Sequence, residues 1–524
     1  MHINIHINME ENLELGFDQQ STPDLDKYDA IIIGAGLGGL GAATQLTKEG
    51  KNILLLEKHN APGGFATSFV RGRFEFESAL HELSGFGTPE NPSGLYSYFT
   101  ELGLIPDKIQ FHYAPELYAC VFQDGQKYVL PYDPDEYGQY LILHFPHEKE
   151  NILKFIKVIK NIYEGMSGPI KPLRILFKHM WLIRALGMST PQFLRKFFTD
   201  VRLMNVIQQF WAYLSKSPED SSAVLFIGAL MSYLTKKAAF PDKRSHNMSQ
   251  LLCEYVLENG GEIRLNSLVN KIITQNERAI GVELINGQRY FGKSIISNVN
   301  PVCTVSKMLP KGTFKDSYIK RITAPPLGSS IFTVYLGLNK SPETLGIDLY
   351  EVFINLSDDI NEAALHTNLD QTKIMVATCY NLIDPDISPP GTTMLALAVL
   401  HPGEIWQSVP PTKYFDMKEK VANDLIDVCE DILYPNIRES IEVVEIASPL
   451  TYYRYSKHLN GTIYGTNTNV LDNPVLKLKQ RTPLKGLYFC GSWIGEGGGY
   501  DPSFNSGRKA AKYVLRQFNE DGGK

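Results

Sequence analysis

The chain has 524 residues, of which 43% are hydrophobic and 21% charged, so it can bury one or two sizeable cores. Its six cysteines are scattered without a CxxC pair, which argues against a disulfide framework or a zinc site and suits a reducing compartment. The net charge is −6, and we expect a cytoplasmic protein without a metal or a nucleic-acid partner.

Residues 1–26 are polar and acidic, and they lack the basic start, apolar core and small-residue cleavage site of a secretory signal. This composition predicts a disordered tail.

The next stretch, Tyr28–Lys58, predicts a complete βαβ unit. Ala30–Ile33 and Ile53–Leu56 are apolar strand runs, and Leu40–Glu49 can form the helix between them. A GxGxxG motif connects the first strand to this helix, at Gly34, Gly36 and Gly39.

Each position of this motif has a physical reason. Gly34 permits the tight turn, Gly36 lets the backbone approach a pyrophosphate, and Gly39 lets helix and strand pack closely. Glu57 follows the second strand, where an acid binds ribose hydroxyls. The unit therefore predicts a dinucleotide site, to which we also assign Gly38 and Lys58.

A second glycine doublet, Gly63 and Gly64, follows Glu57 and is not needed by a plain NAD domain. It resembles the segment that makes a second close approach to the cofactor in FAD proteins of glutathione-reductase type. The branch concerned includes amine oxidases, phytoene desaturases, carotenoid isomerases and retinol saturases.

Within that branch, four segments resemble the phytoene desaturase, carotenoid isomerase and retinol saturase group. "FEFESALHEL" is similar to the group's "leFDtGlHyi", with Glu77, Ser78 and His81 matching in kind. "LVNKIITQNERAIGVEL" is similar to a strand pair in which the backbone of Val269 would meet the adenine. The other two segments are "SPLTYYRYSKHLNGTIYG" and the closing "GLYFCGSWIGEGGGYDPSFNSGRKAA".

The closing segment predicts a strand at Leu487–Cys490, a turn at Gly491, and a glycine run, Gly497–Gly499, that brings backbone amides against the flavin. The positive end of the following helix would face the flavin N1 and O2 atoms and favour the anionic reduced form. The expected cofactor contacts in this segment are Gly491, Ser492, Gly498, Gly499, Pro502 and Ser503.

Four departures from the group's pattern put the substrate in doubt, although FAD binding survives them. Ala79 stands at a glycine position, Glu496 at a proline, Ser245–Met248 at a "GGM" signature, and Phe65 at an arginine that is frequent in amine oxidases.

Residues 151–216 contain eleven basic residues and two acidic ones, a local charge of +9. Thr190 and Pro191 predict a helix start, after which large apolar residues recur at helical spacing as far as Trp211. This basic amphipathic region is either a peripheral membrane contact or part of a core with a basic outer side. The uncharged segment Ser221–Thr235 is shorter than a typical membrane span and predicts a buried helix beside the flavin.

The predicted fold class is α/β. A Rossmann-like FAD-binding domain of glutathione-reductase type is discontinuous over 27–100, 248–304 and 466–520. An α+β substrate domain is inserted as 101–247 and 305–465. Its mixed sheet includes Ser329–Asn339 and Thr393–Leu400, and the basic region forms its helical cap.

The resemblance implies an FAD-dependent oxidoreductase that desaturates, saturates or isomerises a lipophilic isoprenoid or polyene, such as a carotenoid or retinoid. Flavin N5 takes or gives a hydride. His81 either relays a proton near the flavin or only hydrogen-bonds to backbone. Tyr500 and Asp501 are further catalytic candidates, although Asp501 could instead cap the final helix.

Two other functions stay open. The first is a flavin oxidase, dehydrogenase or isomerase of another apolar metabolite, such as a polyunsaturated fatty acid. The second is a lipid-binding protein of Rab GDP-dissociation-inhibitor type, against which the retention of all the cofactor motifs argues. No second GxGxxG marks a nicotinamide domain, so a quinone or oxygen is the expected electron acceptor.

Overall fold

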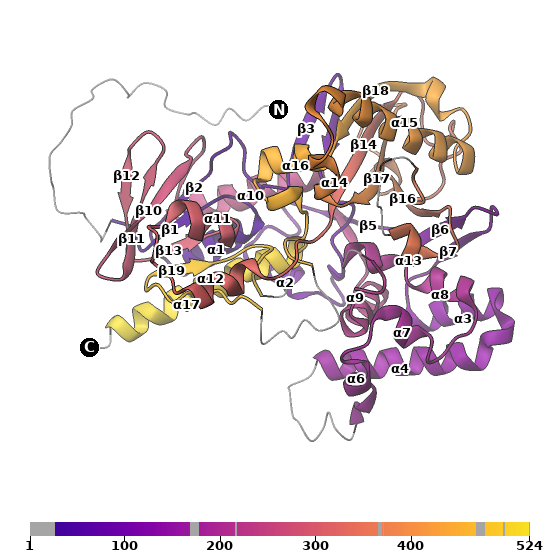
Figure 1. The fold of residues 1–524 in the computed structure, drawn as a ribbon, viewed down its shortest axis with the longest axis horizontal. Coiled ribbons are helices and arrows are strands. Elements are labelled where there is room, and N and C mark those ends of the chain that lie inside the picture. The colour runs from indigo at the N-terminus through magenta and orange to yellow at the C-terminus, as the bar shows by residue number, and fades with distance from the viewer. Residues whose placement is uncertain are drawn as a thin grey trace.

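The computed structural model describes residues 27–167, 178–214, 217–364, 369, 371–467, 477–495 and 498–522. Figure 1 shows a region built on a small parallel sheet beside a region built on a larger sheet, with a group of helices below the latter. The predicted tail, together with Lys171, Arg174, Lys216, Glu496 and Gly497, lies outside the described residues.

A five-stranded parallel sheet, in the order β19-β13-β1-β2-β9, joins segments far apart in the sequence. Its strands β1 and β2 have the predicted bounds, whereas β19 ends one residue earlier than predicted. The strands are β1 (Ala30–Ile33), β2 (Ile53–Leu56), β9 (Glu262–Arg264), β13 (Ile295–Ser297) and β19 (Leu487–Phe489). The four residues of β1 and of β2 are all buried, as in a sheet covered on both faces.

The helices α1 (Leu37–Lys48) and α17 (Tyr500–Gly522) pack against each other beside this sheet. Their backbones touch, because a Cβ atom at Gly507 would lie 1.8 Å from the carbonyl oxygen of Gly38. The helix α1 begins at Leu37, three residues before the predicted start. The close contact places the beginning of the last helix next to the beginning of the first.

The seven-stranded sheet has the order β18-β14-β17-β16-β15-β6-β7 and is antiparallel except between β15 and β6. Its strands are β6 (Tyr118–Phe122), β7 (Lys127–Leu130), β14 (Ser330–Leu338), β15 (Glu351–Asn355), β16 (Ile374–Cys379), β17 (Thr393–His401) and β18 (Ile441–Ala447). On one face, alternate residues such as Phe332 and Leu397 form a core with α15 (Tyr414–Ile432). The opposite face borders a cavity.

The helices at the bottom of Figure 1 form a cap on the seven-stranded-sheet region. They are α3 (Pro134–His144), α4 (Lys149–Ser167), α6 (Met180–Ala185), α7 (Thr190–Leu194), α8 (Val201–Ile207) and α9 (Ala223–Lys236). The central helix α4 packs against α3, α6 and α9. The predicted buried helix is α9, and it reaches the cavity through Leu225, Ala229 and Tyr233.

The remaining elements connect these parts. They are the hairpin β3 (Ser68–Arg71) and β4 (Phe74–Glu77), the pair β5 (Phe111–Tyr113) and β8 (Ala239–Pro241), the antiparallel sheet β10 (Val269–Gln275), β11 (Arg278–Leu284) and β12 (Arg289–Phe291), and the helices α2 (Gly94–Glu101), α10 (Arg244–Glu258), α11 (Pro301–Cys303), α12 (Asp316–Thr323), α13 (Ile360–Ala364), α14 (Gly403–Gln407) and α16 (Pro449–Ser456).

The helix that was predicted to run on from Thr190 is interrupted. It starts at Thr190, with Ser189 and Gln192 forming a capping box, but α7 ends at Leu194. A new helix, α8, is capped by Asp200, whose carboxylate accepts from Leu203 N at 2.9 Å. The apolar spacing therefore reflects three short pieces packed on one core, the last being the 3₁₀ turn Gln209–Tyr213.

Most apolar side chains of the basic region are buried, including Phe155, Ile159, Leu194, Phe198 and Ile207. Several of its basic side chains form ion pairs with acidic side chains. Lys160 pairs with Asp135, Lys178 with Glu164, and Arg195 with Glu219. Described residues of this region therefore contribute mainly to a core with a basic outer side.

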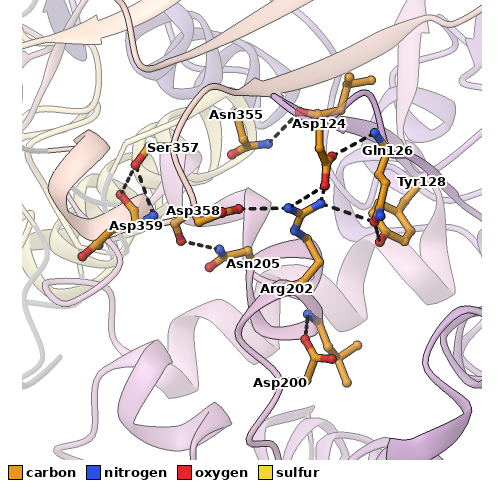
Figure 2. A network of polar contacts seen from close by, with 12 residues as sticks. Asp124, Gln126, Tyr128, Asp200, Arg202, Asn205, Asn355, Ser357, Asp358 and Asp359 are labelled. Atoms are coloured by element: carbon orange, nitrogen blue, oxygen red, sulfur yellow. Dashed lines mark hydrogen bonds and ion pairs between the residues drawn. The ribbon is translucent and has the colours of Figure 1, made fainter.

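Arg202, another of these basic residues, contacts several side chains (Figure 2). Its guanidinium donates to Asp124 at 3.1 Å and to Asp358 at 3.0 Å, and it lies 4.1 Å from the centroid of the Phe122 ring. It holds the pKa of Asp124 below its usual range through a side-chain hydrogen bond. Arg202 thus joins α8 to the β6–β7 turn and to the loop after β15.

No helix within the described ranges has both the length and the apolar character needed to cross a membrane.

Candidate active site

One cavity of about 1020 Å³ extends from the glycine segments of the parallel sheet to the inner face of the seven-stranded sheet. Alternate residues of three strands form its apolar wall, as expected for one face of a sheet. They are Ile331, Thr333 and Tyr335 of β14, Ile374 and Val376 of β16, and Ala396, Ala398 and Leu400 of β17. The same cavity therefore joins the predicted cofactor segments to the predicted substrate region.

Almost all the predicted cofactor residues line this cavity. They are Gly34, Gly36, Gly38, Glu57, Lys58, Gly63, Gly64, Val269, Gly491, Ser492, Gly498, Gly499, Pro502 and Ser503. Gly39 does not line it. A Cβ atom at Gly39 would lie 1.9 Å from the carbonyl oxygen of Gly34, so this glycine permits helix and strand to touch.

Glu57 directly follows β2, and backbone amides hold its buried carboxylate in place. Ala35 N donates to Oε2 at 2.7 Å, and His59 N donates to Oε1 at 2.9 Å. Lys58 also lines the cavity, but its ammonium group donates to the carbonyl oxygen of Tyr455 at 2.6 Å. Burial lowers the pKa of Lys58.

Sequence reasoning missed Asn298, which lies between the GxGxxG segment and Gly491. It follows β13 and lines the cavity, and Cβ atoms at Gly36, Gly38 and Gly491 would lie 2.4–2.9 Å from its side-chain amide. The sequence contained a signal for Asn298, because it is a polar residue that follows an apolar strand. Such residues of parallel strands gather at the sheet edge where ligands bind.

The cavity also contains buried donors that lack partners. Asn300 Nδ2 and Trp493 Nε1 line it and have no hydrogen-bond partner within the described parts of the chain. Such atoms are rare in folded proteins unless a ligand or water completes them. Together with the glycine segments and Glu57, these donors fit a dinucleotide that carries a phosphate, a ribose and a flavin ring.

The segment that carries His81 is fixed from both sides. The buried Glu77 carboxylate accepts from Ser245 N at 2.9 Å and Ser245 Oγ at 2.7 Å, at the start of α10. Tyr335 OH donates to Ser78 O at 2.5 Å, Tyr380 OH donates to Leu80 O at 3.0 Å, and Tyr350 OH donates to His81 O. Three tyrosines of the larger sheet region thereby set the position of the histidine.

The His81 side chain is 12% exposed and lines the cavity. Its Nδ1 lies 3.0 Å from Glu351 Oε1, and the Tyr213 hydroxyl donates to the same oxygen at 2.5 Å. When Nδ1 donates to this carboxylate, Nε2 remains as the atom that can exchange a proton. The hydrogen bonds that the structure gives the His81 ring are all made by Nδ1. Glu351 and Tyr213 were not predicted from the sequence. The signal that was available for Glu351 is that this acid begins β15, a strand whose residues are all buried.

Tyr500 and Asp501, the other predicted catalytic residues, also line the cavity. Tyr500 OH donates to Phe65 O at 2.8 Å, and burial raises the pKa of Tyr500 well above its usual range. Asp501 accepts from Asn505 Nδ2 at 2.8 Å within the first turn of α17. The helix begins at Tyr500, so Asp501 is not its cap residue.

Comparisons with known proteins agree with this geometry. The family model described as "Flavin containing amine oxidoreductase" matches residues 37–515. Prolycopene isomerase from Daucus carota is 28% identical over 499 residues, covering 89% of this chain and 76% of that protein. All-trans-retinol 13,14-reductase from Danio rerio is 23% identical over 524 residues, covering 91% and 84%.

Among solved structures, putrescine oxidase bound to putrescine has a similar fold, with a TM-score of 0.64 at 16% identity, covering 93% of this chain and 99% of that one. The family match spans most of the chain, and the cavity residues fit the cofactor. The chain belongs to the flavin-containing amine oxidoreductase family and is an FAD-dependent oxidoreductase.

Proposed function

We propose that this enzyme desaturates, saturates or isomerises carbon–carbon bonds of a lipophilic isoprenoid or polyene, such as a carotenoid or retinoid. The observation that carries the proposal is the continuous apolar wall of β14, β16 and β17, which faces the same cavity as the cofactor segments. The relatives named for prolycopene and for all-trans-retinol support this substrate class.

The predicted cofactor residues would hold FAD, which when bound supplies hydride transfer at its N5 atom. The sheet wall would hold an extended apolar chain and exclude water from it. Glu351 and Tyr213 would orient the His81 ring, so that Nε2 holds or releases a proton beside the substrate. Tyr500 would act by its hydrogen bond and not by losing its proton.

The test is an absorbance spectrum of the purified protein before and after anaerobic dithionite, followed by carotenoids, retinoids and polyunsaturated fatty acids. We expect a flavin spectrum that one isoprenoid class bleaches, or, without bleaching, a saturated or isomerised isoprenoid product. Turnover of a fatty acid alone would contradict the isoprenoid assignment and favour another apolar metabolite. For a net oxidation, we infer that the electrons pass to a quinone or oxygen.

We also propose that the enzyme contacts a membrane surface through α6 and the residue that follows it. Met180, Ile183 and Leu186 expose apolar side chains there, and Arg184 lies over the Trp181 ring at 5.2 Å. Neighbouring apolar and cationic side chains are the composition of an interfacial helix. Such a contact would give access to a water-insoluble substrate.

The double variant Ile183→Ser/Leu186→Ser is expected to bind vesicles of phosphatidylcholine and phosphatidylserine about tenfold more weakly than the parent, because it removes two exposed apolar side chains. Vesicle cosedimentation at low salt, where charge attraction is strongest, measures this. Val201→Ser is the control, because the exposure of Val201 (55%) lies between those of Ile183 (38%) and Leu186 (61%) but the residue belongs to α8. No binding by the parent, or equal binding by the double variant, would defeat the proposal.

A further inference from the structure

The cavity wall contains a buried carboxyl group that the proposed chemistry does not use. Glu82 is 9% exposed and lines the cavity directly after His81. Its Oε1 has no hydrogen-bond partner within the described ranges. Buried polar atoms are nearly always paired, so this oxygen indicates that a ligand or a water completes the site.

The surroundings of Glu82 favour its neutral form. Burial raises the pKa of Glu82 well above its usual range, and the charges of Glu351 and Glu116 raise it further, whereas a hydrogen bond from Tyr233 opposes them. Neighbouring buried carboxyl groups do not both ionise readily, because like charges repel strongly at low dielectric. Glu351 Oε1 already accepts from His81 Nδ1 and from the Tyr213 hydroxyl, whereas its Oε2, like Glu82 Oε1, has no hydrogen-bond partner within the described ranges.

A second polar atom of the same cavity is also unpaired. Trp211 is 1% exposed and lines the cavity, and its Nε1 has no partner in the described part of the chain. Tyr233 of α9 lines the cavity too. Besides its apolar sheet wall, the cavity therefore has an acceptor, Glu82 Oε1, and a donor, Trp211 Nε1, that no side chain of the described residues pairs.

We infer that Glu82 anchors a neutral oxygen function, a hydroxyl or a carbonyl, on the apolar substrate. The inference rests on the proposed function and narrows its substrate class. A hydroxyl can accept from the neutral carboxyl group and donate back to it, and a carbonyl oxygen can accept from it. A hydrocarbon leaves Oε1 unpaired, and a carboxylate adds a negative charge near Glu351 at low dielectric.

The experiment measures dissociation constants of the flavin-loaded enzyme for four retinoids that share one polyene chain: the hydrocarbon, the alcohol, the aldehyde and the carboxylate. Quenching of protein fluorescence provides the readout. We expect the alcohol and aldehyde to bind at least about tenfold more tightly than the other two. Glu82→Leu should remove this preference without weakening hydrocarbon binding, and Glu82→Gln, which keeps a donor and an acceptor, should retain most of it.

Glu116→Gln is the matched control. Glu116 is also a carboxyl group near Glu351 with a raised pKa, but it does not line the cavity, so the end-group preference should not change. Equal affinity for alcohol and hydrocarbon would mean that only water occupies the site and would overturn the inference. So would equal weakening of all four ligands by Glu82→Leu, or no retinoid binding.

Failure of the proposed function gives a different result. In that case neither carotenoids nor retinoids are converted, whatever group they end in. If polyenes are converted and the end group has no influence, the subsite alone is wrong.

Discussion

Gly36→Val is expected to produce a folded protein that has lost its flavin. A Cβ atom at Gly36 would lie 2.9 Å from Asn298 Nδ2, which is the end of a side chain that can move aside. The valine methyl groups would then fill the space between Gly36 and the Gly63–Gly64 doublet, where the pyrophosphate approaches the backbone. The flavin content should fall to less than about one tenth of the parent's. A dissociation constant for FAD that is raised about a hundredfold readily produces this loss.

The measurement is the ratio of flavin absorbance to protein absorbance, with circular dichroism and a thermal melt to show that the variant is folded. Gly94→Val is a suitable control, since a Cβ atom there has no neighbour within 4 Å. Gly39→Val would be uninformative, because its side chain would collide with the carbonyl group of Gly34, the residue that follows β1. Stoichiometric flavin in folded Gly36→Val would refute the assigned cofactor geometry.

The sequence predicted those parts of the fold that are determined by residues close together in the chain. The strands β1 and β2 were correctly bounded because each is a short apolar run that changes abruptly at its ends. The break after Leu194 was not predictable in this way. Glu148, about fifty residues earlier, accepts from the amides of Thr199 and Asp200 at 3.0 and 3.2 Å. This distant acceptor satisfies backbone groups outside the helix, and residue spacing contains no trace of it.

The candidate site likewise has residues that the sequence predicted and residues that only the folded chain reveals. The glycines were found because a close backbone approach leaves no alternative residue, so the requirement is visible in the sequence. Glu351 was not found, because its role depends on a pairing with His81 across 270 residues. A carboxylate at the start of a strand is by itself an ordinary feature, and only the folded chain shows that it faces an imidazole.

His81→Ala is expected to lower kcat on the isoprenoid substrate by about 10²- to 10⁴-fold, the usual contribution of a positioned acid or base. The flavin content should remain that of the parent, because the His81 side chain bonds to Glu351 and not to the glycine segments. Added imidazole should restore part of the rate, which it would not do if His81 only stabilised the fold. Unchanged turnover would remove His81 from the mechanism.

Glu351→Gln distinguishes an oriented histidine from one that acts alone. Glutamine can still occupy the position, but it cannot match a carboxylate as the acceptor of both His81 Nδ1 and the Tyr213 hydroxyl. We expect kcat to fall about tenfold or more with little change in KM, because the ring loses its orientation while the apolar wall is intact. Thr378→Val is the control. Its hydroxyl lies 3.4 Å from the same Nδ1 but carries no charge, so its loss should change kcat less than about threefold. Equal effects of the two variants would mean that packing around the ring, and not the carboxylate, sets the position of His81.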